Sequence, residues 1–96
     1  MVRHIILWKL KSELTDAEKQ SVKAGVEGLL GQIPGMTAVT VRTEGLPSST
    51  ADMMLDTTFE SAAALKGYKT HPAHVAVADG KVRPFVETRL CLDYEE

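Results

Sequence analysis

Apolar residues recur at every second position along both ends of the chain, which is the pattern of a β-strand. In residues 2–10 and 86–94 both sides of the alternation carry apolar side chains, which predicts strands that are buried on both faces. In the first segment, one side holds His4, Ile6, Trp8 and Leu10, and the other holds Ile5 and Leu7. In the last segment, one side holds Leu90, Leu92 and Tyr94, and the other holds Cys91 and Asp93.

Residues 15–33 have the three-to-four-residue spacing of an amphipathic helix. Thr15 and Glu18 have the spacing of a capping box, which predicts the start of the helix. Pro34-Gly35 predicts its end. The stripe expected to face the core consists of Val22, Val26, Leu29, Leu30 and Ile33.

Two further strands and two short helices follow. Residues 37–43 are β-branched and alternating, and residues 53–59 form another strand after a loop rich in Gly, Pro and Ser. Ser61 is placed to cap a helix that reaches Tyr68. Pro72 opens another helix, which Gly80 weakens and Pro84 ends. The order β-α-β-β-α-β is the ferredoxin-like plan, an α+β fold with an antiparallel sheet.

A sheet whose helices all lie on one face leaves its other face uncovered. Here the uncovered face carries Ile5, Leu7, Leu90 and Leu92. Because a large exposed apolar patch usually marks an interface, we expect a second copy to cover it, sheet to sheet, in a symmetric homodimer. A helix or a partner of another kind is the alternative.

Composition narrows the class of protein. The 96 residues are enough for one domain, expected over residues 1–96, and the net charge of −2 argues against a nucleic-acid partner. No segment approaches the roughly 20 apolar residues of a membrane span. The single cysteine, Cys91, leaves no intrachain disulfide and no cysteine-based zinc cluster. With no signal-peptide pattern at the start, we expect a cytoplasmic protein.

The segment Tyr68-Lys69-Thr70-His71-Pro72-Ala73-His74 gathers most of the candidate chemistry. A residue before proline is pushed out of the helical region, so Tyr68 lies near the end of one helix and His74 in the first turn of the next. The positive end of a helix and burial both disfavour an imidazolium, which predicts a neutral His74 able to act as a base. The alternative is that both rings simply fill the helix junction. His71 and His74 lack an evident third ligand, so no metal is expected.

The whole chain resembles the stress-responsive A/B barrel (Dabb) family of the dimeric α/β-barrel superfamily. The matching segments are His4–Leu10, Ile33-Pro34-Gly35, Phe59-Glu60-Ser61, the Tyr68–His74 segment and Leu92-Asp93-Tyr94. The resemblance implies a ferredoxin-like protomer whose two sheets form a barrel-like homodimer.

The resemblance also implies a chemistry. In a plant polyketide cyclase that is similar to this chain, the residues matching Tyr68 and His74 carry out an aldol condensation without a cofactor. The residue matching His4 lines the pocket of that cyclase. Lys69 and Thr70 stand where the cyclase has isoleucines, so we do not expect a substrate with a long alkyl chain.

The ferredoxin-like order makes the first and last strands antiparallel neighbours. This order places His4 opposite Asp93 and Trp8 opposite Arg89, and we expect Asp93 to orient the His4 ring and to favour its charged form. With Tyr68 and His74 as candidate catalytic residues, the expected pocket is apolar with a few polar groups, the usual form of a small-molecule site. Its predicted lining is His4, Ile6, Trp8, Leu55, Thr57 and Asp93.

Such a set could abstract a proton next to a carbonyl. His74 would be the base, the Tyr68 hydroxyl would donate to the enolate oxygen, and no cofactor would be needed. The first hypothesis is therefore a homodimer that binds a small carbonyl or aromatic compound and performs cyclase-like proton transfer. The alternatives are a non-catalytic stress-response or structural dimer and a small cofactor-free monooxygenase. The sequence specifies neither the substrate nor the pathway.

Overall fold

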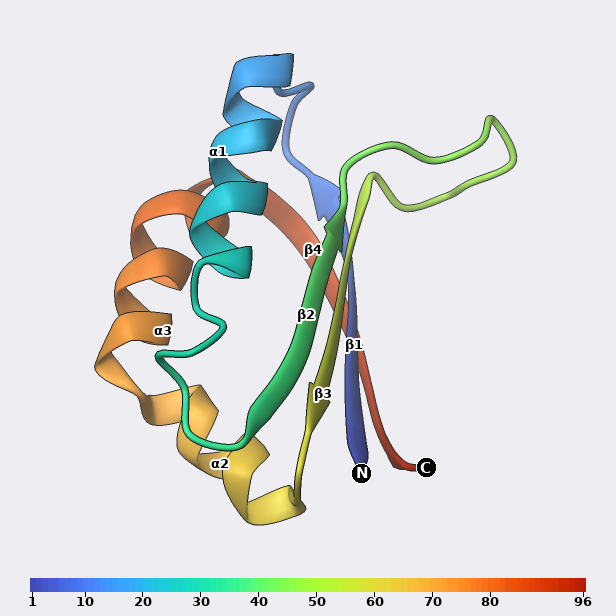
Figure 1. Ribbon diagram of the computed structural model, residues 1–96. Helices are drawn as coiled ribbons and strands as arrows, with labels where there is room; N and C mark the ends of the chain where they lie inside the picture. Colours follow the sequence, from blue (N-terminus) through green and yellow to red (C-terminus); the bar gives the residue numbers. More distant parts are fainter.

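Four strands form one antiparallel sheet in the order β2-β3-β1-β4, and all helices lie on one of its faces (Figure 1). The computed structural model describes residues 1–96. This is the predicted α+β, ferredoxin-like fold, and its elements follow the predicted order. They are β1 (Val2–Leu10), α1 (Asp16–Glu27), β2 (Met36–Arg42), β3 (Met53–Phe59), α2 (Ala62–Thr70), α3 (Pro72–Val77), η1 (Ala78–Val82), η2 (Arg83–Phe85) and β4 (Val86–Glu95).

The first helix starts as predicted and ends early. The Glu18 N–H donates to Thr15 Oγ1 at 3.1 Å, and the Thr15 N–H donates to Glu18 Oε1 at 3.0 Å, which completes the capping box. The helix ends at Glu27, because the chain turns at Gly28 and again at Gly31, whose φ is +89°. The 3.6-residue spacing therefore no longer applies beyond Glu27. Leu30, predicted in the buried stripe, is 49% exposed, and that prediction was wrong.

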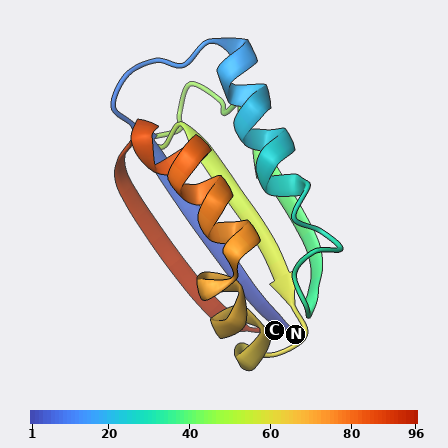
Figure 2. The same cartoon turned by 90° about the vertical axis from the view of Figure 1, so that its left-hand side faces the viewer.

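The second covering segment changes its helical type along its length. From Pro72 it runs as the α-helix α3, widens into the π-helix η1 at Ala78 and tightens into the 3-10 turn η2 before β4. Gly80, predicted to weaken this helix, lies inside the π-helix. Figure 2 shows that this segment lies over the sheet beside α1, with β4 at the sheet edge next to it.

Strand β4 is less buried than predicted. Leu90 and Leu92 are each 65% exposed on the face without helices, and on the other face Arg89, Cys91 and Asp93 are also exposed. The reason is position, because β4 pairs only with β1 and forms an edge of the sheet. The prediction of burial was therefore wrong for the helix-covered face of β4, whereas burial of its open face stays a prediction that depends on a second copy. In β1 only the helix-covered face is fully buried.

The core lies between the sheet and the helices. Phe59, Leu29 and Val41 are among its fully or almost fully buried side chains. No helix is long and apolar enough to cross a membrane.

Candidate active site

The junction between α2 and α3 brings two rings together. His71 is extended because it precedes Pro72, and its Nδ1 accepts a hydrogen bond of 3.1 Å from the Ala73 N–H, which caps α3. Tyr68 lies in the last turn of α2 and His74 in the first turn of α3. Their ring centroids are 4.0 Å apart at an interplanar angle of 32°.

His74 is placed to be a neutral base. Its Nδ1 is buried and has no hydrogen-bond partner in the chain. Burial lowers the pKa of His74 below its usual value, and the positive charge of Arg83 acts in the same direction, although the backbone of Lys69 and Tyr68 acts in the opposite direction. Since a neutral imidazole always has one ring nitrogen free to accept a proton, His74 can serve as a base at pH 7.

Tyr68 is placed to be a hydrogen-bond donor. Burial raises the pKa of its phenol to about 12, although the charge of Arg89 acts in the opposite direction. The hydroxyl is therefore protonated at neutral pH. A protonated phenol beside a base can donate to an oxygen that gains negative charge during a reaction.

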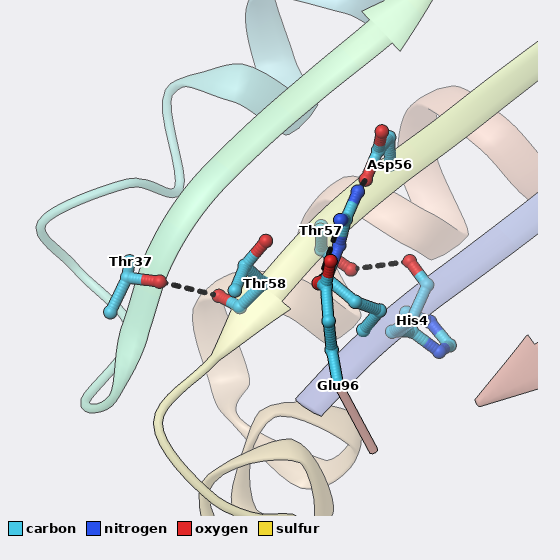
Figure 3. Close-up of polar contacts among 7 residues, drawn as sticks. His4, Thr37, Asp56, Thr57, Thr58 and Glu96 are labelled. Carbon is cyan, nitrogen blue, oxygen red and sulfur yellow. Dashed lines mark hydrogen bonds and ion pairs between the residues drawn. The ribbon is translucent and has the colours of Figure 1, made fainter. Parts of the chain in front are cut away.

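His4 reaches the same place from β1. It pairs with Asp93 in the β1–β4 register, as predicted, and its Nδ1 forms a hydrogen bond with the Asp93 carboxylate. Thr57 fixes the backbone at this point, because its Oγ1 donates to the His4 carbonyl oxygen at 2.7 Å (Figure 3). The His4 and Tyr68 ring centroids lie 6.0 Å apart, edge to face.

Two opposing effects set the charge of His4. Burial lowers the pKa of His4, and the hydrogen bond and charge of Asp93 only partly oppose this effect. The pKa of Asp93 is also lowered, because the hydrogen bonds from His4 and Cys91 outweigh the opposite effect of burial. An ionised Asp93 accepts the proton on Nδ1, so a neutral His4 keeps Nε2 as an acceptor. Asp93 thus favours the charged form of His4, as expected, but the burial of His4, which is 1% exposed, has the larger effect and leaves its pKa below the usual value.

A cavity of about 460 Å³ lies between the sheet and the α3–η1 segment. Six of the eight predicted site residues line it: His4, Ile6, Trp8, Leu55, Tyr68 and His74. The other two lie behind the lining. Thr57 is fully buried beside His4 on the neighbouring strand β3, and Asp93 forms a hydrogen bond with the His4 ring from β4. Both act on the site through His4 and do not contribute to the wall.

Sequence reasoning missed several lining residues. Ala78 and Val82 come from the π-helix η1, a type of turn that often occurs at functional sites. Lys69, Arg83 and Arg89 add three positive charges to the wall. The expected position of Arg89 opposite Trp8 could have identified Arg89 as a lining residue. The inward position of η1 depends on the tertiary packing and had no signal in the sequence.

One group of side chains has the types of ligands that metals use. Ligand atoms of His4, Cys91 and Asp93 lie within 4.8 Å of one another. In this structure they bind one another, because Cys91 Sγ lies 3.3 Å from Asp93 Oδ1 and His4 Nδ1 bonds the same carboxylate. Lys69 Nζ, 3.5 Å from Asp93 Oδ2, adds a positive charge that opposes a bound cation. Burial and the neighbouring Asp93 raise the pKa of the Cys91 thiol, which keeps it protonated.

Comparisons with known proteins show the family and the fold of this chain. The family model described as the stress responsive A/B barrel domain (Dabb) matches residues 2–96. The olivetolic acid cyclase of Cannabis sativa is 32% identical in an alignment that covers 97% of this chain and 94% of the cyclase.

Two solved structures have the same fold. A dimeric protein of unknown function from Bacteroides fragilis is 30% identical, with a TM-score of 0.81 over 99% of this chain and 95% of that chain. A Dabb family protein from Mesorhizobium loti is 26% identical, with the same TM-score and the same coverage. The chain therefore belongs to the stress responsive A/B barrel (Dabb) family.

Proposed function

We propose that this chain acts as a single Dabb domain over residues 1–96, whose cavity binds a small carbonyl or aromatic compound and moves a proton next to its carbonyl. The observation that carries the proposal is the pair formed by Tyr68 and His74, whose rings lie 4.0 Å apart on the wall of a cavity of about 460 Å³. The similarity to a cyclase at 32% identity supports it. The exposed, unpaired Cys91 suits a reducing cytoplasm.

The two rings take different roles in this reaction. Neutral His74 removes the proton from the carbon next to the carbonyl, and the electron pair of that bond forms the enolate. The Tyr68 hydroxyl donates a hydrogen bond to the enolate oxygen. His4, held by Asp93, lines the floor beside them and offers Nε2 as an acceptor. The side chains of Ile6, Trp8 and Leu55 hold the apolar part of the compound and exclude water.

The reaction is tested by proton exchange at a simple ketone. Phenylacetone in D₂O loses its α-protons to solvent, and ¹H NMR follows the loss. The protein should accelerate the exchange, His74→Gln should lower the acceleration by about 10²–10⁴-fold, and Tyr68→Phe should lower it by about 10²–10³-fold. Circular dichroism confirms that each variant is folded.

The matched control is Lys66→Gln, which removes an exposed charge on α2 outside the cavity lining and should leave the exchange unchanged. Exchange that persists in His74→Gln would contradict the proposed base. A folded protein without any acceleration would favour the non-catalytic dimer. Oxygen uptake with an electron-rich phenol would favour the monooxygenase.

We also propose that the functional unit is a homodimer formed through the open face of the sheet. Leu90, Leu92 and Tyr94 are exposed there, and the similar protein from Bacteroides fragilis is described as dimeric. Native mass spectrometry of the 10.5 kDa chain should find two copies, and Leu92→Lys should shift the population to one copy. Leu30→Lys makes the same change outside the sheet and should keep the dimer. A monomeric wild-type protein would contradict the proposal.

A further inference from the structure

Charge is unevenly distributed around the cavity. Three of its fourteen lining residues are Lys or Arg, and none is Asp or Glu. The chain as a whole has 11 basic and 13 acidic residues, so the cavity has the opposite bias. A concave site lined by charges of one sign attracts ligands of the other sign.

The three cations differ in whether the chain already neutralises them. Arg83 pairs with Asp79 on the preceding turn, and Lys69 Nζ lies 3.5 Å from Asp93 Oδ2. Arg89 takes part in none of the ion pairs of the structure. The wall therefore has one uncompensated positive charge, which comes from β4.

Arg89 is close enough to act on the reacting groups. It lies opposite Trp8 in the β1–β4 register and contributes to the same cavity as Tyr68 and His74. Its positive charge is among the causes that lower the pKa of His4 and oppose the rise in the pKa of Tyr68. An anion bound at Arg89 would thus occupy the same cavity as the proposed reaction.

We propose that the ligand of this cavity is a small keto acid with an apolar or aromatic body, whose single carboxylate pairs with Arg89. The carbonyl part of this statement rests on the proposed function, while the carboxylate part rests on the unpaired arginine. One uncompensated cation calls for one negative charge, which favours a carboxylate over a phosphate dianion. The planar guanidinium also matches a carboxylate with two parallel hydrogen bonds.

A matched pair of probes isolates the carboxylate. 3-Benzoylpropionate carries an aryl ketone, an acidic CH₂ next to it and a carboxylate, and in 3-benzoylpropionamide an uncharged amide of similar size replaces the carboxylate. Isothermal titration calorimetry should show that the wild-type protein binds the acid about tenfold more tightly than the amide. Added salt should weaken binding of the acid more than binding of the amide, because it screens the charge.

Variants test whether Arg89 is the recognition residue. Arg89→Gln should bring the ratio of the two affinities close to one. Arg89→Lys should restore part of the preference for the acid, since lysine keeps the positive charge but cannot form the two parallel hydrogen bonds of a guanidinium. Lys66→Gln, which removes a charge outside the cavity, should leave both affinities unchanged. Circular dichroism and the thermal midpoint show that the Arg89 variants are folded.

The outcomes separate this inference from the proposed function. A preference for the acid that Arg89→Gln abolishes supports the inference, even when the α-protons of the bound acid do not exchange in D₂O. Exchange of phenylacetone with equal affinities for acid and amide supports proton transfer and overturns the anionic ligand. Failure of both probes to bind at millimolar concentration, or an unchanged preference in Arg89→Gln, also overturns it.

Discussion

The two halves of the helix layer cover the same sheet in different ways. Under α1, Val22, Val41 and Met53 pack together, and none of them is more than 4% exposed. Under α3 and η1, the sheet is separated from its covering helices by a cavity of about 460 Å³. One half is therefore densely packed, while the other contains open space, which the proposed function assigns to a ligand.

The covering helices explain the difference. The first is a regular α-helix, so its buried residues recur at the spacing that interdigitates with a sheet. The second passes through α, π and 3-10 turns between Pro72 and Phe85. The π-turn places Ala78 and Val82 on the wall of the cavity, and Val82 also packs against the core under α1. A change of helical type therefore separates the packed half from the hollow half.

The same enlargement in each half should have unequal effects on stability. Val41→Phe adds volume where the side chain is 1% exposed and has no free space, so the free energy of unfolding should fall by about 1–3 kcal/mol. Val82→Phe adds the same volume beside the cavity and should cost less than about 1 kcal/mol. Urea denaturation of the two variants measures both effects.

The effects on binding should be reversed. Val82→Phe fills part of the cavity and should weaken binding of 3-benzoylpropionate, while Val41→Phe should leave its affinity unchanged in the folded protein. Equal losses of stability in the two variants would contradict the distinction between a packed and a hollow half.

Lowering the pH should destabilise the protein mainly through the two histidines of the hollow half, and this effect on the free energy of unfolding should be smaller than that of Val41→Phe. The pKa values of His4 and His74 are lowered in the folded protein. Below about pH 6.5 the unfolded chain therefore binds more protons than the folded chain, and the free energy of unfolding falls as pH decreases toward the folded pKa values. Each histidine contributes at most about 1.4 kcal/mol per pH unit in this window.

Urea denaturation at pH 7.5 and 5.5 checks this prediction. His74→Gln removes one of the two groups, so its loss of stability between these pH values should be smaller than that of the wild-type protein. Above pH 7, where both histidines are neutral in the folded and the unfolded states, the stability of the wild-type protein and of the variant should change with pH to the same extent. An identical pH dependence of wild-type and variant proteins would show that His74 is not held neutral by burial.

Local chemistry was enough to predict much of the site. Thr15 and Ser61 cap helices, and Pro72 ends one helix and starts the next, because these effects depend on neighbouring backbone groups alone. The element order then placed His4 opposite Asp93 before any side-chain position was known. Capping and helix breaks depend on neighbouring residues, and strand pairing here depends on the order of the elements, so both can be predicted from the sequence.

The rest depended on distances between segments that are far apart in the chain. The sequence by itself determined the order of the strands, the α2–α3 junction that pairs Tyr68 with His74, and the open apolar face. Only the tertiary structure decided that burial outweighs Asp93 at His4, that the π-helix leaves a cavity and that Arg89 has no partner. The physical reason is that burial and charge compensation depend on the whole packed surroundings of a group, whereas capping and alternation depend on its nearest neighbours.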